Sequence, residues 1–136
     1  MLPSKPQLYT APPVDGGSPQ LKGGACRCGH VFHPFQAHGC EKCGATGGAL
    51  QPVLLAGAGQ LVASARVLVH AGEGRRPPFV VVSVKLDGGP VVRTLLAGTD
   101  LDDLAIGRRM QACLVEVGRD ATHDQPVGEL RFARAA

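Results

Sequence analysis

The sequence predicts a mainly β protein in three parts: an N-terminal extended arm at 1–21, a rubredoxin-like zinc ribbon at 22–48 and a small OB-fold β-barrel at 49–136. Two observations predict the first two parts, because five prolines crowd the first twenty residues and four cysteines then fall within eighteen residues. A third observation predicts the barrel. Runs rich in valine, leucine and alanine follow, broken by glycine-rich turns and without a helical period.

The arm cannot hold a regular helix or strand for long, because its prolines and the stretch Asp15-Gly-Gly-Ser18 interrupt both. Apolar side chains are nevertheless spaced along it, at Leu2, Leu8, Tyr9 and Val14. These side chains allow the arm to wrap over its own domain or a partner, and a solvated tail is an equal alternative.

The cysteines form two pairs, Cys26-Arg-Cys28 and Cys40-Glu-Lys-Cys43, and a glycine directly follows each pair. Paired thiolates on short turns are how a small chain holds a tetrahedral metal, and glycine permits the positive φ that such turns need. Four thiolates leave no open coordination position, so we expect Cys26, Cys28, Cys40 and Cys43 to hold a structural zinc. One residue, not two, separates the first pair, so its turn is the tighter one.

Three alternatives stay open for these cysteines. Iron in a rubredoxin-type site uses the same ligands. Imidazole is an equally good zinc ligand, so His30, His33 or His38 in the same loop could replace a thiolate. Disulfides are the third alternative, but the chain shows no basic-then-apolar leader, which indicates a cytoplasmic protein in a reducing compartment. Cys113 lies in an apolar run and is interpreted as a small buried hydrophobe.

Five or six strands are expected after the ribbon, and five strands with a short helical insert suit a small closed barrel. The candidate segments are 50–56, 60–70, 79–86, 91–97, 109–117 and 128–133. The clearest hairpin turn is Asp87-Gly-Gly89, and one short helical turn is expected within 100–107. The OB-fold is the commonest such barrel, because closure removes the unpaired strand edges.

Charge and hydropathy argue against nucleic acid and membrane as partners. Four basic residues face two acidic ones up to residue 48, and ten face nine afterwards, so the net charge of +3 forms no basic stripe. Single-strand binders stack bases on exposed aromatics, whereas the predicted barrel holds only Phe79 and Phe132. The longest apolar segment is too short and too interrupted to cross a bilayer. It spans 50–69 and is broken by Gln60, Ser64 and Arg66.

Several local motifs together resemble a known family. In the ribbon they are Leu21-Lys-Gly-Gly-Ala-Cys26, Cys28-Gly-His-Val-Phe-His-Pro-Phe35 and Gly39-Cys-Glu-Lys-Cys-Gly44. In the barrel they are Gly59-Gln-Leu-Val-Ala-Ser64, Pro77-Pro-Phe-Val-Val-Val-Ser-Val-Lys-Leu-Asp-Gly88 and Leu104-Ala-Ile-Gly107. The chain thereby resembles the zinc-ribbon plus OB-fold proteins first catalogued as domain of unknown function thirty-five. The spacing of Cys26 and Cys28 departs from the two residues more usual in that family.

The resemblance implies an accessory, non-catalytic zinc-binding subunit of a thiolase-type complex that cleaves or forms a carbon-carbon bond in acyl-CoA substrates. The partner would be a thiolase-like protein subunit in a hetero-oligomer, and the coenzyme A thioester would be a ligand of the complex. An acyl-CoA aldolase or hydratase complex is the alternative. The chain shows no nucleophile beside a base in a recognisable motif, so we expect no catalytic residue and no activity alone.

Coenzyme A carries phosphates, so arginines in flexible loops are candidates for binding it. These are Arg75, Arg76, Arg108 and Arg109. For each one, a solvated surface arginine is the simpler explanation. Nucleic-acid binding, electron transfer through an iron-bound ribbon and a standalone enzyme are the other hypotheses, and the sequence supports each of them less.

Overall fold

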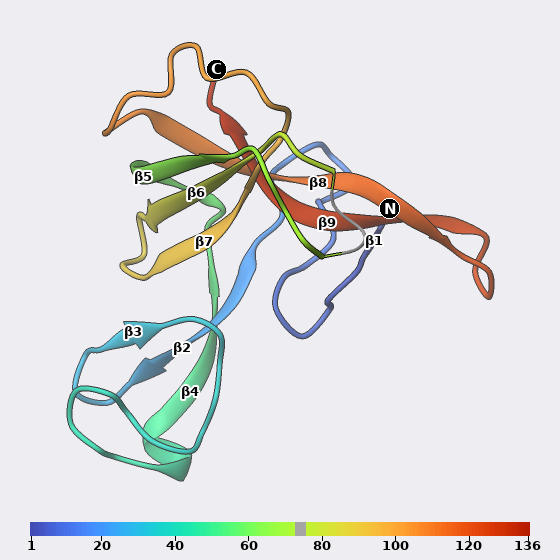
Figure 1. The fold of residues 1–136 in the computed structure, drawn as a ribbon. Coiled ribbons are helices and arrows are strands. Elements are labelled where there is room, and N and C mark those ends of the chain that lie inside the picture. The colour runs from blue at the N-terminus through green and yellow to red at the C-terminus, as the bar shows by residue number, and fades with distance from the viewer. Residues whose placement is uncertain (73–75) are drawn as a thin grey trace.

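The computed structural model describes residues 1–72 and 76–136, which form two β-sheets and an N-terminal arm. Figure 1 shows the larger sheet as a barrel, with a small three-stranded sheet attached at one end. The helix found in the described residues is a single 3-10 turn, η1 (Gly47–Ala49). No helix there is long and apolar enough to cross a membrane.

The barrel consists of five strands that close on themselves, as predicted. In order around the barrel they are β5 (Ala58–Val67), β6 (Phe79–Leu86), β7 (Val91–Leu96), β9 (Gln125–Arg134) and β8 (Arg109–Asp120). Closure comes from β8, which pairs antiparallel with both β9 and β5. This mainly β, OB-like barrel confirms the predicted fold class.

Strand alternation fills the barrel with aliphatic side chains. On β6, Val80, Val82, Val84 and Leu86 all point inward and are each at most 1% exposed. Phe132 is fully buried among them. Every second residue of a strand faces the same side, so a valine-rich strand with this period buries one whole face.

The predicted hairpin turn is confirmed. At the turn, Gly89 has a φ of 123°, in the left-handed region that favours glycine. Its amide donates to the carbonyl of Leu86 at 2.9 Å, and the two flanking strands then pair in register from Val84 opposite Val92.

The predicted helical turn within 100–107 is wrong, since the backbone forms two separate turns there. The Asp100 carboxylate accepts a hydrogen bond from the amide of Asp102 at 2.9 Å. A short acidic side chain that binds nearby backbone in this way competes with helical hydrogen bonding. Asp103 follows with a positive φ of 56°, which also ends any helix.

The β8–β9 hairpin is longer than its sequence pattern indicates, and Figure 1 shows it projecting beyond the barrel. The expected strands at 109–117 and 128–133 extend to Asp120 and back to Gln125. The outer part is solvent-exposed on both faces, so it lacks the alternation by which strands are recognised. A bulge between Glu116 and Gly118 shifts its register.

The smaller sheet contains β3 (Val31–Phe32), β2 (Leu21–Cys26) and β4 (Leu50–Leu55), in that order. We expected the segment 50–56 to begin the barrel part of the chain, but β4 pairs with β2 from end to end. At the root of the sheet Leu21 lies opposite Leu55, and both side chains join the barrel core. The ribbon is therefore rooted in the barrel by its own strands.

The arm packs onto its own domain in this structure. Its first strand, β1 (Leu2–Pro3), pairs in parallel with β9 at Val127 and Gly128. Tyr9 is only 3% exposed, belongs to the barrel core and bridges Leu21. These contacts favour the wrapped arm over the solvated tail.

Candidate functional site

The four cysteines of the ribbon, which form two pairs along the chain, converge at its tip. Their sulfur atoms all lie within 4.8 Å of one another. The Sγ atoms of Cys26 and Cys43 are 3.6 Å apart, and those of Cys28 and Cys40 are 3.7 Å apart. All four are free thiols, with Cys26 and Cys40 buried and the other two exposed.

These distances fit a tetrahedral metal. Zinc–sulfur bonds of about 2.3 Å in a regular tetrahedron place neighbouring sulfurs about 3.8 Å apart. The shortest sulfur separations, 3.6 and 3.7 Å, are close to that edge length and much longer than a disulfide bond of about 2.05 Å. The donor set is therefore compatible with a structural zinc, and the thiol pairs are not disulfides.

Two tight turns present the sulfurs despite their unequal spacing. The amide of Gly29 donates to the carbonyl of Cys26, and the amide of Gly44 donates to that of Cys40, each at 2.9 Å. Both glycines have positive φ, 99° and 79°. Glycine adopts this conformation without the steric cost that a Cβ would add, which explains why one follows each pair.

Hydrogen bonds from backbone amides favour the thiolate form of part of the cluster. Hydrogen bonding from the amide of Cys43, supported by that of Lys42, lowers the pKa of the Cys40 thiol to about 6. At Cys26 the amide of Cys28 acts in the same direction, but burial and the neighbouring thiols together raise the pKa to about 12. Four adjacent thiolates repel one another, so full deprotonation requires a cation among them.

The three histidines of the loop make other contacts. His30 stacks on Phe32, and its Nε2 lies 3.6 Å from a carboxylate oxygen of Glu41. His33 contacts the carbonyl of Leu8 through Nε2 at 3.1 Å, and His38 is exposed. Within the described residues the clustered metal-ligand side chains are the four cysteines alone, so the geometry favours the four-sulfur set.

Two aromatic rings form the floor of the cysteine cluster. Phe32 and Phe35 are stacked with their centroids 6.3 Å apart, and both pack with Cys26 and Cys40. A Cβ added at Gly24 would overlap both rings, so this position admits only glycine without a shift.

The arginines expected to bind coenzyme A phosphates do not converge. Arg75 lies outside the described residues, and Arg76 is exposed before β6. Arg109 begins β8, directly after Arg108, and pairs with Gln60, whereas the β5 end nearest Arg76 is Val67. The two groups therefore stand at opposite ends of the β5–β6 ladder.

Arg108 and Arg109 already have acidic partners. Arg109 makes a bidentate pair with Asp87, at 2.8 and 2.7 Å, and this pair holds the pKa of the Asp87 carboxyl below its usual range. Arg108 contacts Asp103 at 2.9 Å. Sequence reasoning missed Asp87 as a partner, because only the strand order brings the end of β6 to the start of β8.

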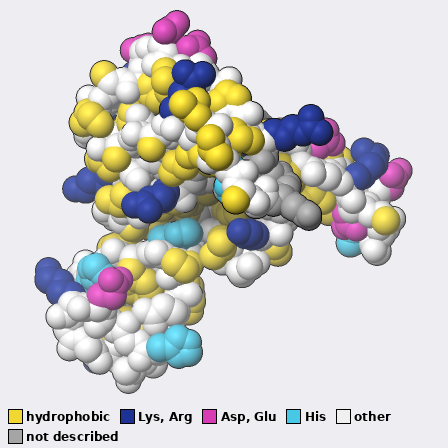
Figure 2. Space-filling model, viewed as in Figure 1, with side chains coloured by type: hydrophobic (Ala, Val, Ile, Leu, Met, Phe, Trp, Pro, Cys, Tyr) yellow, Lys and Arg dark blue, Asp and Glu magenta, His cyan; other side chains and the backbone are white. Residues whose placement is uncertain are grey.

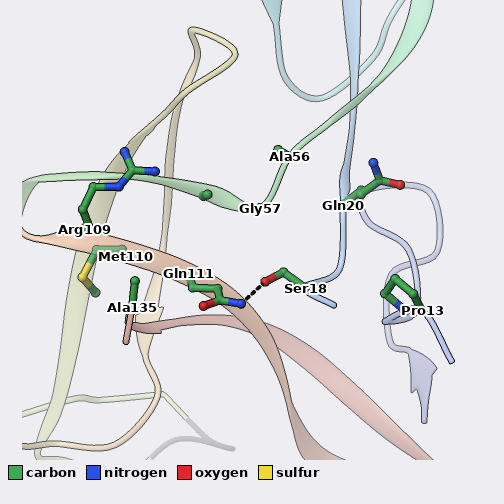
Figure 3. A pocket seen from close by; sticks show the side chains of 10 residues that line it. Pro13, Ser18, Gln20, Ala56, Gly57, Arg109, Met110, Gln111 and Ala135 are labelled. Carbon is green, nitrogen blue, oxygen red and sulfur yellow. Dashed lines mark hydrogen bonds between the residues drawn. The ribbon is translucent and has the colours of Figure 1, made fainter. Parts of the chain in front are cut away.

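A cavity of about 440 Å³ lies between the arm and the barrel beside Arg109. In Figure 3 Gln111 of the barrel points toward Ser18 of the arm, and it donates to the Ser18 hydroxyl at 2.6 Å. The volume is within the range of small-molecule sites, roughly 300–1,000 Å³. The sequence held no signal for this cavity, because one wall is the arm.

Cys113 is separate from the metal cluster. It is half-buried on β8, its thiol contacts the carbonyl of Arg131, and burial raises its pKa. A raised pKa keeps the sulfur protonated and weakly nucleophilic. These properties agree with a packing role.

Comparison with known proteins supports the fold and the family. Residues 52–115 match the family described as "ChsH2, C-terminal OB-fold domain". A solved structure described as "Ltp2-ChsH2(DUF35) aldolase" is similar, with a TM-score of 0.65 and 24% sequence identity over 86% of this chain and 86% of that chain. None of the curated proteins matches the sequence. The predicted resemblance to the zinc-ribbon plus OB-fold family is confirmed by the domain match and the shared fold.

Proposed function

We propose that the chain, whose residues 52–115 match the ChsH2-type OB-fold domain, is an accessory, non-catalytic zinc-binding subunit of a thiolase-like or aldolase complex. The complex would cleave or form a carbon-carbon bond beside the thioester carbonyl of an acyl-CoA. The observation that supports this most is the similarity to the Ltp2-ChsH2(DUF35) aldolase, which extends over 86% of both chains.

The metal would have a structural role in this proposal. Cys26, Cys28, Cys40 and Cys43 would hold zinc, which supplies the cross-link that fixes the ribbon turns when bound. Four thiolate ligands leave no coordination position for a substrate or water. The ribbon would then be a rigid module that contacts the partner during assembly.

Catalytic groups would come from the partner subunit. Several histidines outside the cysteine loop make local contacts, such as His123 with Asp120 at 2.7 Å and His70 edge-on to Phe79. The chain's contribution would be to cover the acyl-CoA site, which positions the thioester and excludes water. Arg76, Arg108 and Arg109 remain candidates for the phosphates of coenzyme A, and Arg109 also lines the cavity between the arm and the barrel.

Nucleic-acid binding finds less support. Phe132 is fully buried, and Phe79 is half-buried with its ring in contact with His70. Neither ring is the open stacking platform on which single-strand binders depend.

Affinity capture of the full chain from its native cells, with the co-purifying proteins identified by mass spectrometry, tests the proposal. We expect a near-stoichiometric acyl-CoA enzyme of thiolase or aldolase type, whose carbon-carbon bond activity falls when this subunit is removed. Arg108→Gln and Arg109→Gln variants of the complex then test the phosphate contacts through the KM for acyl-CoA. Capture of RNA, DNA or ribosomal proteins instead would contradict the proposal.

A further inference from the structure

A small cavity lies where the arm, the ribbon and the barrel meet, and it is distinct from the cysteine cluster. Its volume is about 130 Å³, many times what one ordered water requires. Lys5 of the arm, His33 of the ribbon and Arg93 of β7 all line it. Figure 2 shows a histidine and basic side chains gathered at the waist between the ribbon and the barrel.

The charge around this cavity is unbalanced. Glu129 is the acidic residue in its lining, and one of its carboxylate oxygens lies 3.6 Å from Nε of Arg131. That Nε is buried and lacks a hydrogen bond within the described part of the chain, so Glu129 serves as the counter-charge of a third cation. Two cationic side chains, Lys5 and Arg93, thus share the cavity with one carboxylate that is also used elsewhere.

Arg93 is held in place while its terminal nitrogens remain available. Its Nε donates to the Ser83 hydroxyl at 3.4 Å, and Ser83 is itself only 8% exposed. Among the described residues, no carboxylate forms an ion pair with Arg93 or Lys5. The planar guanidinium offers further donors in a geometry that matches phosphate and carboxylate oxygens.

The other side of the cavity is held by backbone contacts. The carbonyl of Lys5 accepts hydrogen bonds from the amides of Leu8 and Tyr9, at 2.9 and 3.4 Å, which closes the arm into a turn. His33 Nε2 is 3.1 Å from the carbonyl of Leu8 and donates to it, because a carbonyl can only accept. Lys5, His33 and Arg93 therefore come from three segments, and the His33 hydrogen bond ties the ribbon to the arm before any ligand arrives.

We propose that this cavity is an oxyanion-binding site, in which Lys5 and Arg93 hold one phosphate or carboxylate group, while His33 ties the ribbon to the arm through its hydrogen bond to the Leu8 carbonyl. The ligand is either a phosphorylated small molecule or a carboxylate side chain of a partner protein. Binding would neutralise Lys5 and Arg93, which have no ion-pair partner among the described residues, and would fasten the arm to the barrel. The site is independent of the proposed acyl-CoA function, and its test requires no partner enzyme.

Tyr9 provides a direct probe, because it lines the cavity and is the one tyrosine of a chain without tryptophan. Tyrosine fluorescence of the zinc-loaded full chain is titrated with inorganic phosphate and, separately, with acetate, while sodium chloride keeps the ionic strength constant. We expect a saturable change. Arg93→Gln and Lys5→Gln should each weaken binding about tenfold to a hundredfold, since each removes a charge-assisted hydrogen bond.

Lys85→Gln is the matched control, because Lys85 is an exposed cation on neighbouring β6 that does not line the cavity. It should leave the affinity unchanged, and zinc content and circular dichroism confirm that each variant is folded. Saturation by phosphate identifies a phosphorylated ligand, and saturation by acetate alone identifies a carboxylate from a protein. No saturable response to either anion, or equal affinity in folded Arg93→Gln, would overturn the proposal.

Discussion

The barrel and the ribbon reach a folded state by different means. The barrel core contains fourteen buried side chains contributed by every barrel strand, by the roots of the ribbon strands and by Tyr9 of the arm. The ribbon tip contains four, and two of these are cysteines, Cys26 and Cys40. A barrel of this kind stabilises itself by apolar burial, at about 25 cal/mol per Å².

The ribbon tip cannot do the same, because four buried side chains do not offset the conformational entropy of ordering its loops. Small modules in this position usually rely on a metal or on disulfides, and the sulfur distances here fit a metal. The two parts of the chain should therefore lose their structure independently. Variants that remove a sulfur should affect the ribbon, and variants that open a cavity should affect the barrel.

The largest expected effect comes from Cys43→Ser. Structural zinc supplies about 10–16 kcal/mol of apparent folding free energy in zinc-finger peptides, and loss of one thiolate removes much of it. We expect zinc content to fall below one equivalent, the ribbon amides to lose protection from hydrogen exchange and partner assembly to stop, while β6 amides stay protected. Mass spectrometry of hydrogen exchange and elemental analysis measure these changes.

Cys113→Ser is the control, because its sulfur lies on β8 away from the cluster. It should retain a full equivalent of zinc and an unchanged exchange pattern. Full zinc and full complex formation in Cys43→Ser, or a lost equivalent in Cys113→Ser, would show that the ligands are assigned wrongly.

The converse variant is Phe132→Ala, which destabilises the barrel. Phe132 is fully buried in the core, so its removal should lower the free energy of unfolding by about 3–5 kcal/mol. Chemical denaturation of the zinc-loaded chain gives this value from the shift in midpoint. Zinc content under native conditions should be unchanged, and loss of zinc in a still-folded Phe132→Ala would contradict the independence of the two parts.

Sequence reasoning anticipated the elements whose cause is local. The strand at 79–86 matches β6 to the residue, because alternating valines make its period plain, and the paired cysteines followed by glycine located the cluster. The predicted helical turn within 100–107 was wrong because the Asp100 carboxylate accepts a hydrogen bond from the amide of Asp102 and Asp103 has a positive φ.

What could not be predicted depends on which segments meet in space. The composition of 50–56 indicates a strand but does not say that β4 pairs with β2. The Arg109–Asp87 pair joins residues twenty-two positions apart, and the cavities beside the arm exist only once the arm has docked. Contacts of this kind depend on the order of the strands in space, so the pattern of residues along the sequence does not predict them.

A smaller effect within the ribbon is expected from Gly24→Ala. The added Cβ would overlap the rings of Phe32 and Phe35, which are stacked beneath the sulfurs. Overpacking of this type costs about 1–3 kcal/mol, so zinc should bind more weakly in a competition titration with a chelator. Gly39→Ala is the control, since a Cβ there meets nothing within 4 Å. Equal zinc affinity in both variants would show that the rings do not support the cluster.

The smallest effect belongs to the barrel surface, at the ion pair of Asp87 with Arg109. The side-chain hydrogen bond from Arg109 lowers the pKa of Asp87 in the folded state below its usual value. A carboxyl with a depressed folded pKa adds stability above its unfolded pKa and loses it as pH falls through the folded value. Asp87→Asn should therefore be less stable than the parent near neutral pH, and the difference should shrink as pH falls below about 4.

Denaturation midpoints of both proteins across this pH range measure the effect, with Asp15→Asn as a control, since Asp15 lies in the exposed part of the arm. Both groups of the pair are about half exposed, at 48% and 51%, so added salt should also reduce the difference. If the stability difference between the parent and Asp87→Asn is constant with pH, then the charge of Asp87 does not stabilise the contact between β6 and β8. Hydrogen bonding that does not depend on that charge would then account for the difference. In that case the charges of Asp87 and Arg109 would contribute nothing measurable to the stability of the barrel, in contrast to the charges of the ribbon.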